Sequence, residues 1–89
     1  MGERYGIAAF RSRSHVLRLE AAARQAGIRG TIVSTPRAVA AGCGLSLKVD
    51  EKDLPRLREM LSRSKDDTLI GLYLAESSAG RTRLQTYAK

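Results

Sequence analysis

The order of its hydrophobic patterns constrains the fold of this chain more than any other feature. Two segments, Val16–Ala26 and Leu54–Leu61, space apolar residues three or four positions apart, which is typical of one face of a helix. Short apolar or alternating runs predict four strands, at 4–10, 28–34, 45–50 and 68–75. The order β-α-β-β-α-β is that of a ferredoxin-like sandwich. We therefore expect an α/β (α+β) domain whose four-stranded antiparallel sheet carries both helices on one face.

Glycine, proline and serine residues support the predicted ends of the helices and strands. Gly27 is a natural C-terminal stop for the first helix, and Ser12 or Ser14 can cap its start. Pro55 fits the first turn of the second helix, where a missing N–H is tolerated. In the third strand, Leu45, Leu47 and Val49 alternate with polar residues, which predicts a half-exposed strand. Residues 77–89 show no clear period, so we expect one domain over 1–76 followed by a loose tail.

The length and the single cysteine bound the class of protein. The chain has 89 residues, of which 43% are hydrophobic, and this is enough for one small core. It has no apolar run near the roughly 20 residues that span a membrane, and no pattern of a secretory signal. One cysteine cannot form an internal disulfide, and a free thiol fits a reducing compartment, so we expect a cytoplasmic protein. One His and one Cys cannot complete a zinc site, so neither a metal nor a cofactor is expected.

The charge is strongly basic. The net charge is +7, and twelve of the 16 basic residues are arginine. Such a field attracts anions, including nucleic acids and oxyanions of sulfur or selenium. However, RNA-binding sheets of this topology stack bases on exposed aromatic residues, and this chain has only one Phe and three Tyr. Nucleic acid is therefore a disfavoured partner, and scattered arginines on a solvated surface are the simpler interpretation.

Cys43 is the residue whose surroundings say most about chemistry. It lies between Gly42 and Gly44, which remove neighbouring side chains and leave room for another molecule near the sulfur. The backbone N–H groups of Gly42, Gly44 and Leu45 can form an anion-binding concavity that stabilises a thiolate. The guanidinium of Arg37 can add positive charge. Thr35 and Pro36 shape the start of the same loop.

Three interpretations of Cys43 stay open at this point. The first is an inert core residue, because free cysteines are often buried. The second is a reactive thiolate that bears a persulfide, and the third is a site of regulatory oxidation. Arg11 and Arg13 follow the first strand and are candidate anion contacts, although a solvated turn is the favoured interpretation. His15, at the start of the first helix, is a surface or capping residue unless it lies near Cys43.

Four sequence motifs together resemble those of a small bacterial family of selenium/sulfur carrier-like proteins. The resemblance covers about residues 4–75 and includes an acidic helix start at 50–54. The motifs that carry it are Phe10-Arg11-Ser12, Ala26-Gly27-Ile28, Ser34-Thr35-Pro36-Arg37 and Cys43-Gly44-Leu45-Ser46-Leu47. The chain departs from the family pattern just before the cysteine, where small apolar residues replace serines that are frequent in the family.

The resemblance implies that Cys43 carries sulfur or selenium as a persulfide or selenosulfide, so the chain is a carrier more than a turnover enzyme. It further implies a donor of the cysteine desulfurase or selenocysteine lyase type, with an unknown acceptor protein. Two alternatives stay open. The Thr35–Gly44 loop could instead bind a small anion or a protein without covalent chemistry. Alternatively, the chain is a redox-sensing protein that dimerises, and its open sheet face is a candidate homodimer interface.

Overall fold

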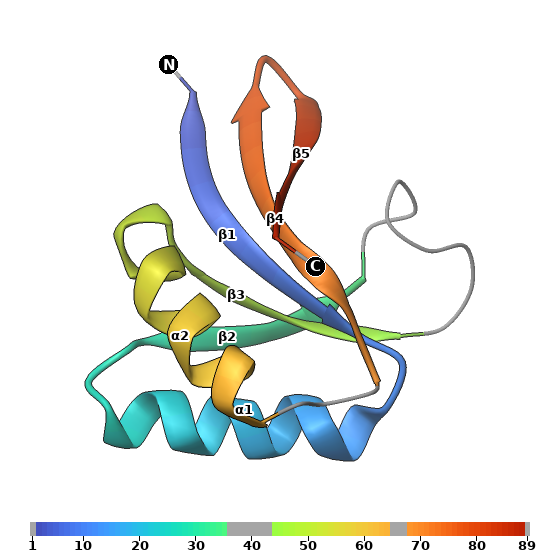
Figure 1. The fold of residues 1–89 in the computed structure, drawn as a ribbon. Helices are drawn as coiled ribbons and strands as arrows, with labels where there is room; N and C mark the ends of the chain where they lie inside the picture. Colours follow the sequence, from blue (N-terminus) through green and yellow to red (C-terminus); the bar gives the residue numbers. More distant parts are fainter. Residues whose placement is uncertain (1, 36–43, 65–67, 89) are drawn as a thin grey trace.

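A computed structural model of the chain describes residues 2–35, 44–64 and 68–88 (Figure 1). Seven regular elements and one short 3₁₀ turn follow one another in the order β-α-β-β-η-α-β-β. Their bounds are β1 Glu3–Phe10, α1 Arg13–Gln25, β2 Gly30–Ser34, β3 Leu45–Asp50, η1 Glu51–Asp53, α2 Leu54–Ser64, β4 Leu69–Ser78 and β5 Arg81–Ala88. The fold is α+β, and every predicted strand and helix is present.

The strands form one antiparallel sheet in the order β2-β3-β1-β4-β5. β1 lies in the middle, paired with β3 from Tyr5↔Asp50 to Ala9↔Ser46 and with β4 over its whole length. This central position explains the continuous apolar run at the end of β1, because side chains on both of its faces are buried. The buried side chains of this run are Ile7, Ala8, Ala9 and Phe10.

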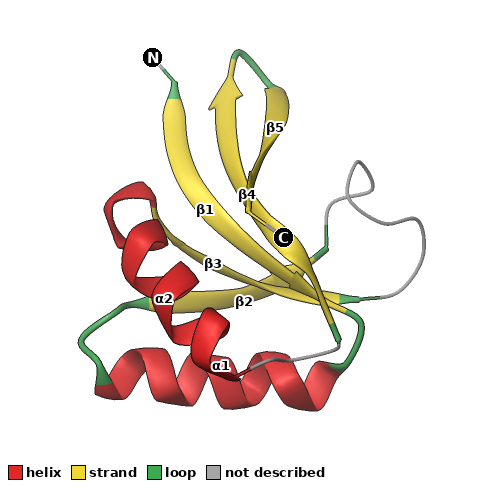
Figure 2. Cartoon of the chain, in the orientation of Figure 1, coloured by secondary structure: helices red, strands yellow, loops and turns green. Residues whose placement is uncertain are grey.

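Both helices pack against the same face of the sheet (Figure 2). α1 contributes one buried apolar stripe to the main core cluster and α2 contributes another, with the helical spacing read from the sequence. The sheet contributes alternate residues of its central strands. The cluster contains Val16, Leu19 and Ala23 from α1, Leu54, Leu57 and Leu61 from α2, and Ala8, Phe10, Leu47, Val49 and Leu72 from the sheet, with Ile28 beside them. Expected placement of both helices on one face is thus confirmed.

A second, smaller apolar cluster occupies the other face of the sheet. Its buried members are Ile7, Ala9 and Ala75, and its partly buried members are Tyr5, Val33, Ile70, Tyr73 and Leu84. Tyr5 and Tyr73 therefore lie on this face of the sheet. This face is partly apolar beside the central strand, which means that it is only partly a solvated surface.

The expectation of a four-stranded sheet with a loose tail is wrong. The sheet has five strands, because Arg81–Ala88 forms β5 and pairs with β4 from Ser78↔Arg81 onward. The hairpin turns through Ala79 and Gly80, both at positive φ (52° and 77°), which suits a two-residue turn between twisted strands. The β4–β5 hairpin and the start of β1 extend away from the helices (Figure 1). Residues 77–88 are thus mostly strand.

The predictions for the ends of the helices are confirmed in part. Gly27 has φ +84° directly after the C-cap residue Ala26, which confirms its role as a stop. Pro55 lies in the first turn of α2, as predicted. Ser12 occupies the N-cap position of α1, but its hydroxyl contacts the Ser14 hydroxyl at 3.0 Å in place of a backbone N–H. In the described part of the chain, no helix is long and apolar enough to cross a membrane.

Candidate functional site

The candidate site divides into residues that the structure describes and residues that it does not. Cys43, Arg37, Pro36 and Gly42 lie within 36–43, outside the described residues. Thr35, Gly44 and Leu45 lie inside them and form the base of the same loop.

Thr35 and Gly44 close the base of the loop, which we call the neck. The backbone N–H of Thr35 donates to the carbonyl oxygen of Gly44 at 3.0 Å, one step beyond the last ladder pair, Ser34↔Leu45. The regular pairing of β2 with β3 thus continues to the last residue before the loop and resumes at the first residue after it. Consequently, the two residues that flank segment 36–43 are held next to each other, and one of them is bonded covalently to Cys43.

A buried pair of hydroxyls reinforces the neck. The Oγ1 atom of Thr35 lies 2.8 Å from the Oγ atom of Ser46, a hydrogen-bond distance, and both residues are buried. The alternation of β3 predicted that Ser46 faces solvent, and this prediction is wrong, because Ser46 is fully buried. It pairs across the ladders with Val33 and Ala9, whose side chains belong to the second apolar cluster. A buried hydroxyl needs a partner, and Thr35 supplies it.

Gly44 provides close packing at the neck. A Cβ atom at this position would lie 3.1 Å from Thr35 Oγ1 and 3.5 Å from the carbonyl oxygen of Phe10. Its φ is not among the positive values of the described glycines, so the reason for glycine here is space and not backbone conformation. The short distance to Phe10 also places the neck beside the end of β1. Leu45, the next residue, packs its side chain against the main core.

Two further segments reach the same end of the sheet. The N–H of Arg11 donates to the carbonyl oxygen of Thr68 at 2.8 Å, which ties the end of β1 to the approach to β4. The Nδ1 atom of His15 lies 2.7 Å from Thr68 Oγ1, so this histidine has a structural partner on the neighbouring segment. Arg13 begins α1 here, and the first turn of that helix contains no acidic residue.

The structure thus brings together the neck, the end of β1 and the start of α1 (Figure 1). Arg11 and Arg13, the candidate anion contacts, are exposed at this end. Sequence reasoning missed three features: the Thr35–Ser46 hydroxyl pair, the Phe10 carbonyl beside Gly44, and the His15–Thr68 contact. Only the hydroxyl pair had a sequence signal, a serine among the apolar residues of a central strand. Within the described residues, no group of His, Cys, Asp and Glu could hold a metal ion.

Comparison with known proteins adds the family. The chain matches the model of the family described as "Putative Se/S carrier protein-like" over residues 5–69, which is well over half of its length. The chain belongs to this family. The match begins in β1, includes the whole loop from Thr35 to Gly44, and ends at the first residue of β4. No curated protein and no solved structure matches the chain.

Proposed function

We propose that this chain carries sulfur or selenium on Cys43. The observation that carries the proposal is the neck: in a chain of the carrier-like family, the hydrogen bond between Thr35 and Gly44 fixes the base of the loop at the residue adjacent to Cys43. A carrier thiol needs an accessible sulfur more than a deep pocket. Glycines on both sides of the thiol supply that access, and Arg37 supplies positive charge.

The proposed step is a thiol–persulfide exchange. The Cys43 thiolate attacks the terminal sulfur of a persulfide on the donor's cysteine, and a new S–S bond forms on Cys43. The bond between that sulfur and the donor's cysteine breaks, and the donor cysteine leaves as a thiolate. One sulfur atom moves and no net oxidation occurs. A selenium atom in the terminal position would move in the same way and leave Cys43 as a selenosulfide.

The resulting anion requires stabilisation. The backbone N–H groups of Gly42, Gly44 and Leu45, together with the Arg37 guanidinium, are the groups that we assign to it. The proposed donor is an enzyme of the cysteine desulfurase or selenocysteine lyase type, and the acceptor is a second protein. Because a free thiol survives under reducing conditions, we place this function in the cytoplasm.

We assign β1 to β4 and the two helices to the ferredoxin-like arrangement, extended at one edge by β5. The pairing of β1 with both β3 and β4 and the position of β2 beside β3 support this assignment. The added strand lies at the edge of the sheet opposite β2, whereas the neck joins the end of β2 to the start of β3.

Intact mass spectrometry tests the function. The full chain is incubated with a bacterial cysteine desulfurase and cysteine, and in parallel with a selenocysteine lyase and selenocysteine. We expect a mass increase of one sulfur or one selenium atom that reductant removes. Cys43→Ser should gain neither atom. An unchanged mass for the wild type with both enzymes, or an equal gain for Cys43→Ser, would contradict the proposal. If Cys43→Ser still performs the function of the protein in the cell, the result would favour the alternative in which the Thr35–Gly44 loop binds a small anion or a protein without covalent chemistry.

A further inference from the structure

The outer face of α1 holds more than half of the net charge of the chain. Residues 11–29 contain five arginines and one glutamate, so this segment carries +4 of the total +7 with His15 neutral. The arginines are Arg11, Arg13, Arg18, Arg24 and Arg29, and all five are exposed. We call this surface the α1 basic face. The buried stripe of the helix points to the sheet, so the arginines are not needed for packing.

Little of this charge is neutralised locally. Arg24 forms an ion pair with Glu20, whose carboxylate lies 3.5 Å away on the same helix. The other four arginines form no ion pair with any residue in the described part of the chain. A surface with several unpaired charges of one sign attracts surfaces of opposite sign and orients them before contact. The α1 basic face therefore favours an acidic partner.

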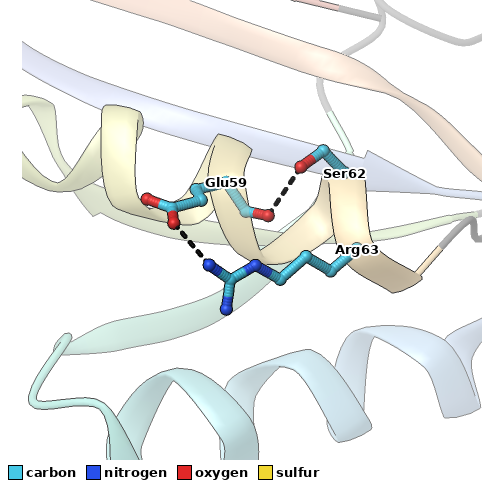
Figure 3. Close-up of polar contacts among 3 residues, drawn as sticks. All are labelled: Glu59, Ser62 and Arg63. Atoms are coloured by element: carbon cyan, nitrogen blue, oxygen red, sulfur yellow. Dashed lines mark hydrogen bonds and ion pairs between the residues drawn. The ribbon is translucent and has the colours of Figure 1, made fainter.

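The corresponding surface around α2 is different. Residues 51–67 contain five basic and five acidic residues, so their net charge is zero. The guanidinium of Arg63 donates to the Glu59 carboxylate at 2.7 Å, and the Ser62 hydroxyl donates to the Glu59 carbonyl at 2.7 Å (Figure 3). Arg56 donates to the backbone carbonyl of Ala26. The arginine content of the chain alone therefore does not make every helix basic, and the excess belongs to α1.

The α1 basic face also has apolar character. Leu17 is 53% exposed, the highest exposure of any large apolar side chain in the described part. It lies four residues after Arg13 and seven before Arg24, so the three share one stripe of the helix. A hollow of about 470 Å³ at the end of α1 is lined by Glu20, Arg24, Arg29 and the chain from Gly27 to Gly30. An exposed apolar side chain that shares a stripe with two arginines is typical of a protein interface.

The same composition argues against RNA as the occupant. Proteins that bind single-stranded RNA stack its bases on aromatic side chains, and residues 11–29 contain no aromatic residue other than the His15 ring. That ring is half-buried and contacts Thr68.

The α1 basic face also begins close to the neck. Its first residue, Arg11, follows Phe10, and the carbonyl oxygen of Phe10 lies beside Gly44.

We propose that the α1 basic face docks an acidic protein surface on the enzyme that loads Cys43, with Leu17 inserted into an apolar recess of that enzyme. This proposal rests on the carrier function and names the side from which the partner approaches. Charge brings the donor to the end of the molecule that bears the neck, and Leu17 adds a contact that slows dissociation.

The test compares two charge reversals of the full chain. Arg18→Glu changes the α1 basic face, and Arg58→Glu is the matched control, an exposed arginine on α2 without an ion pair in the described part. Binding of each to a bacterial cysteine desulfurase, and to a selenocysteine lyase as second probe, is measured at low and high salt. Arg18→Glu should weaken binding about tenfold at low salt, and Arg58→Glu less than about twofold. Leu17→Ala should weaken binding several-fold with the salt dependence unchanged.

Three results would overturn the docking proposal. These are equal weakening by the two reversals, absence of wild-type binding to both enzymes, and tighter binding of a mixed-sequence single-stranded RNA than of either enzyme. The carrier function fails separately, if the wild type binds an enzyme through α1 but gains no sulfur or selenium. If instead Arg18→Glu binds and is loaded like the wild type, the docking proposal fails and the function stands. Glutathione persulfide, a small donor, should load both reversal variants equally.

Discussion

α1 and α2 bury equivalent stripes on the same face of the sheet and present different charge balances to solvent. Each places three apolar residues in the main core, at helical spacing. Outside the core, the segment of α1 has a net charge of +4 and the segment of α2 has a net charge of zero. Packing constrains only the inner stripe of a helix, so the outer residues are free to vary without loss of the fold. A difference that folding does not require is a reason to look for a partner.

The largest expected effect concerns the part that the helices share. Leu19→Ala on α1 and Leu57→Ala on α2 should each lower the free energy of unfolding by about 2–5 kcal/mol, because each leaves a cavity in the core. Leu57 is fully buried and Leu19 is 8% exposed, so Leu57→Ala should cost more. Urea denaturation at equilibrium measures both. A loss below about 1 kcal/mol for either variant would show that its helix is not an equal part of the core.

The same inner stripes were the most predictable part of the fold. Their spacing requires nothing beyond local sequence, and the structure confirms both helices and the first four strands. β5 was not predictable in the same way. Its hairpin turn uses Ala79 at positive φ, where Asn or Asp would be the usual signal, and its strand exposes most of its side chains. β5 forms because it pairs with the edge of β4. A short stretch of sequence contains no information about such a pairing.

The candidate site shows a similar limit. The glycines and the cysteine of the loop could be singled out from the sequence alone. The family match agrees with the resemblance that those motifs indicated. The neck was not visible, because it depends on contacts between residues far apart in the chain: Thr35 with Ser46, and Gly44 with Phe10. The assigned roles of Cys43 and Arg37 stay predictions, since both lie outside the described residues.

A second variant sharpens the comparison at the point where α2 lies close to the sheet. A Cβ atom on Gly6 of β1 would overlap the Leu54 side chain, with Cγ at 2.6 Å and Cδ2 closer. Gly6→Ala should therefore displace the start of α2 and lower the free energy of unfolding by about 1–3 kcal/mol. Gly2→Ala is the matched control, because its Cβ would find only ordinary contacts, the shortest 3.4 Å. If the two variants unfold at the same urea concentration, α2 is not in close contact with β1.

A third variant addresses the neck beside the start of α1. Thr35→Val removes the hydroxyl that partners Ser46 and leaves a buried polar group unsatisfied, which should cost about 1–2 kcal/mol. Thr35→Val combined with Ser46→Ala should cost less than the sum of the two single variants, because the unpaired group is then gone. Urea denaturation of the four proteins gives the coupling energy. Simple additivity would show that the two hydroxyls do not depend on each other.

The smallest effect, and the sharpest test of the outer faces, comes from the two intrahelical ion pairs. Glu59→Gln on α2 and Glu20→Gln on α1 each remove the carboxylate of an i,i+4 pair with an exposed arginine. Because such pairs are solvated and screened, each variant should lose only about 0.3–0.5 kcal/mol of stability, and less at high salt.

Their effects on binding to the donor enzyme should differ. Glu20→Gln removes the one acidic residue of the α1 basic face, frees Arg24, and should tighten binding to the donor enzyme at low salt. Glu59→Gln frees Arg63 on the other helix by the same chemistry and should leave that binding unchanged. Denaturation at two salt concentrations, followed by the binding assay, separates stability from recognition. If both variants tighten binding equally, the enzyme responds to the total charge of the chain, and the difference between the helices has no role in recognition.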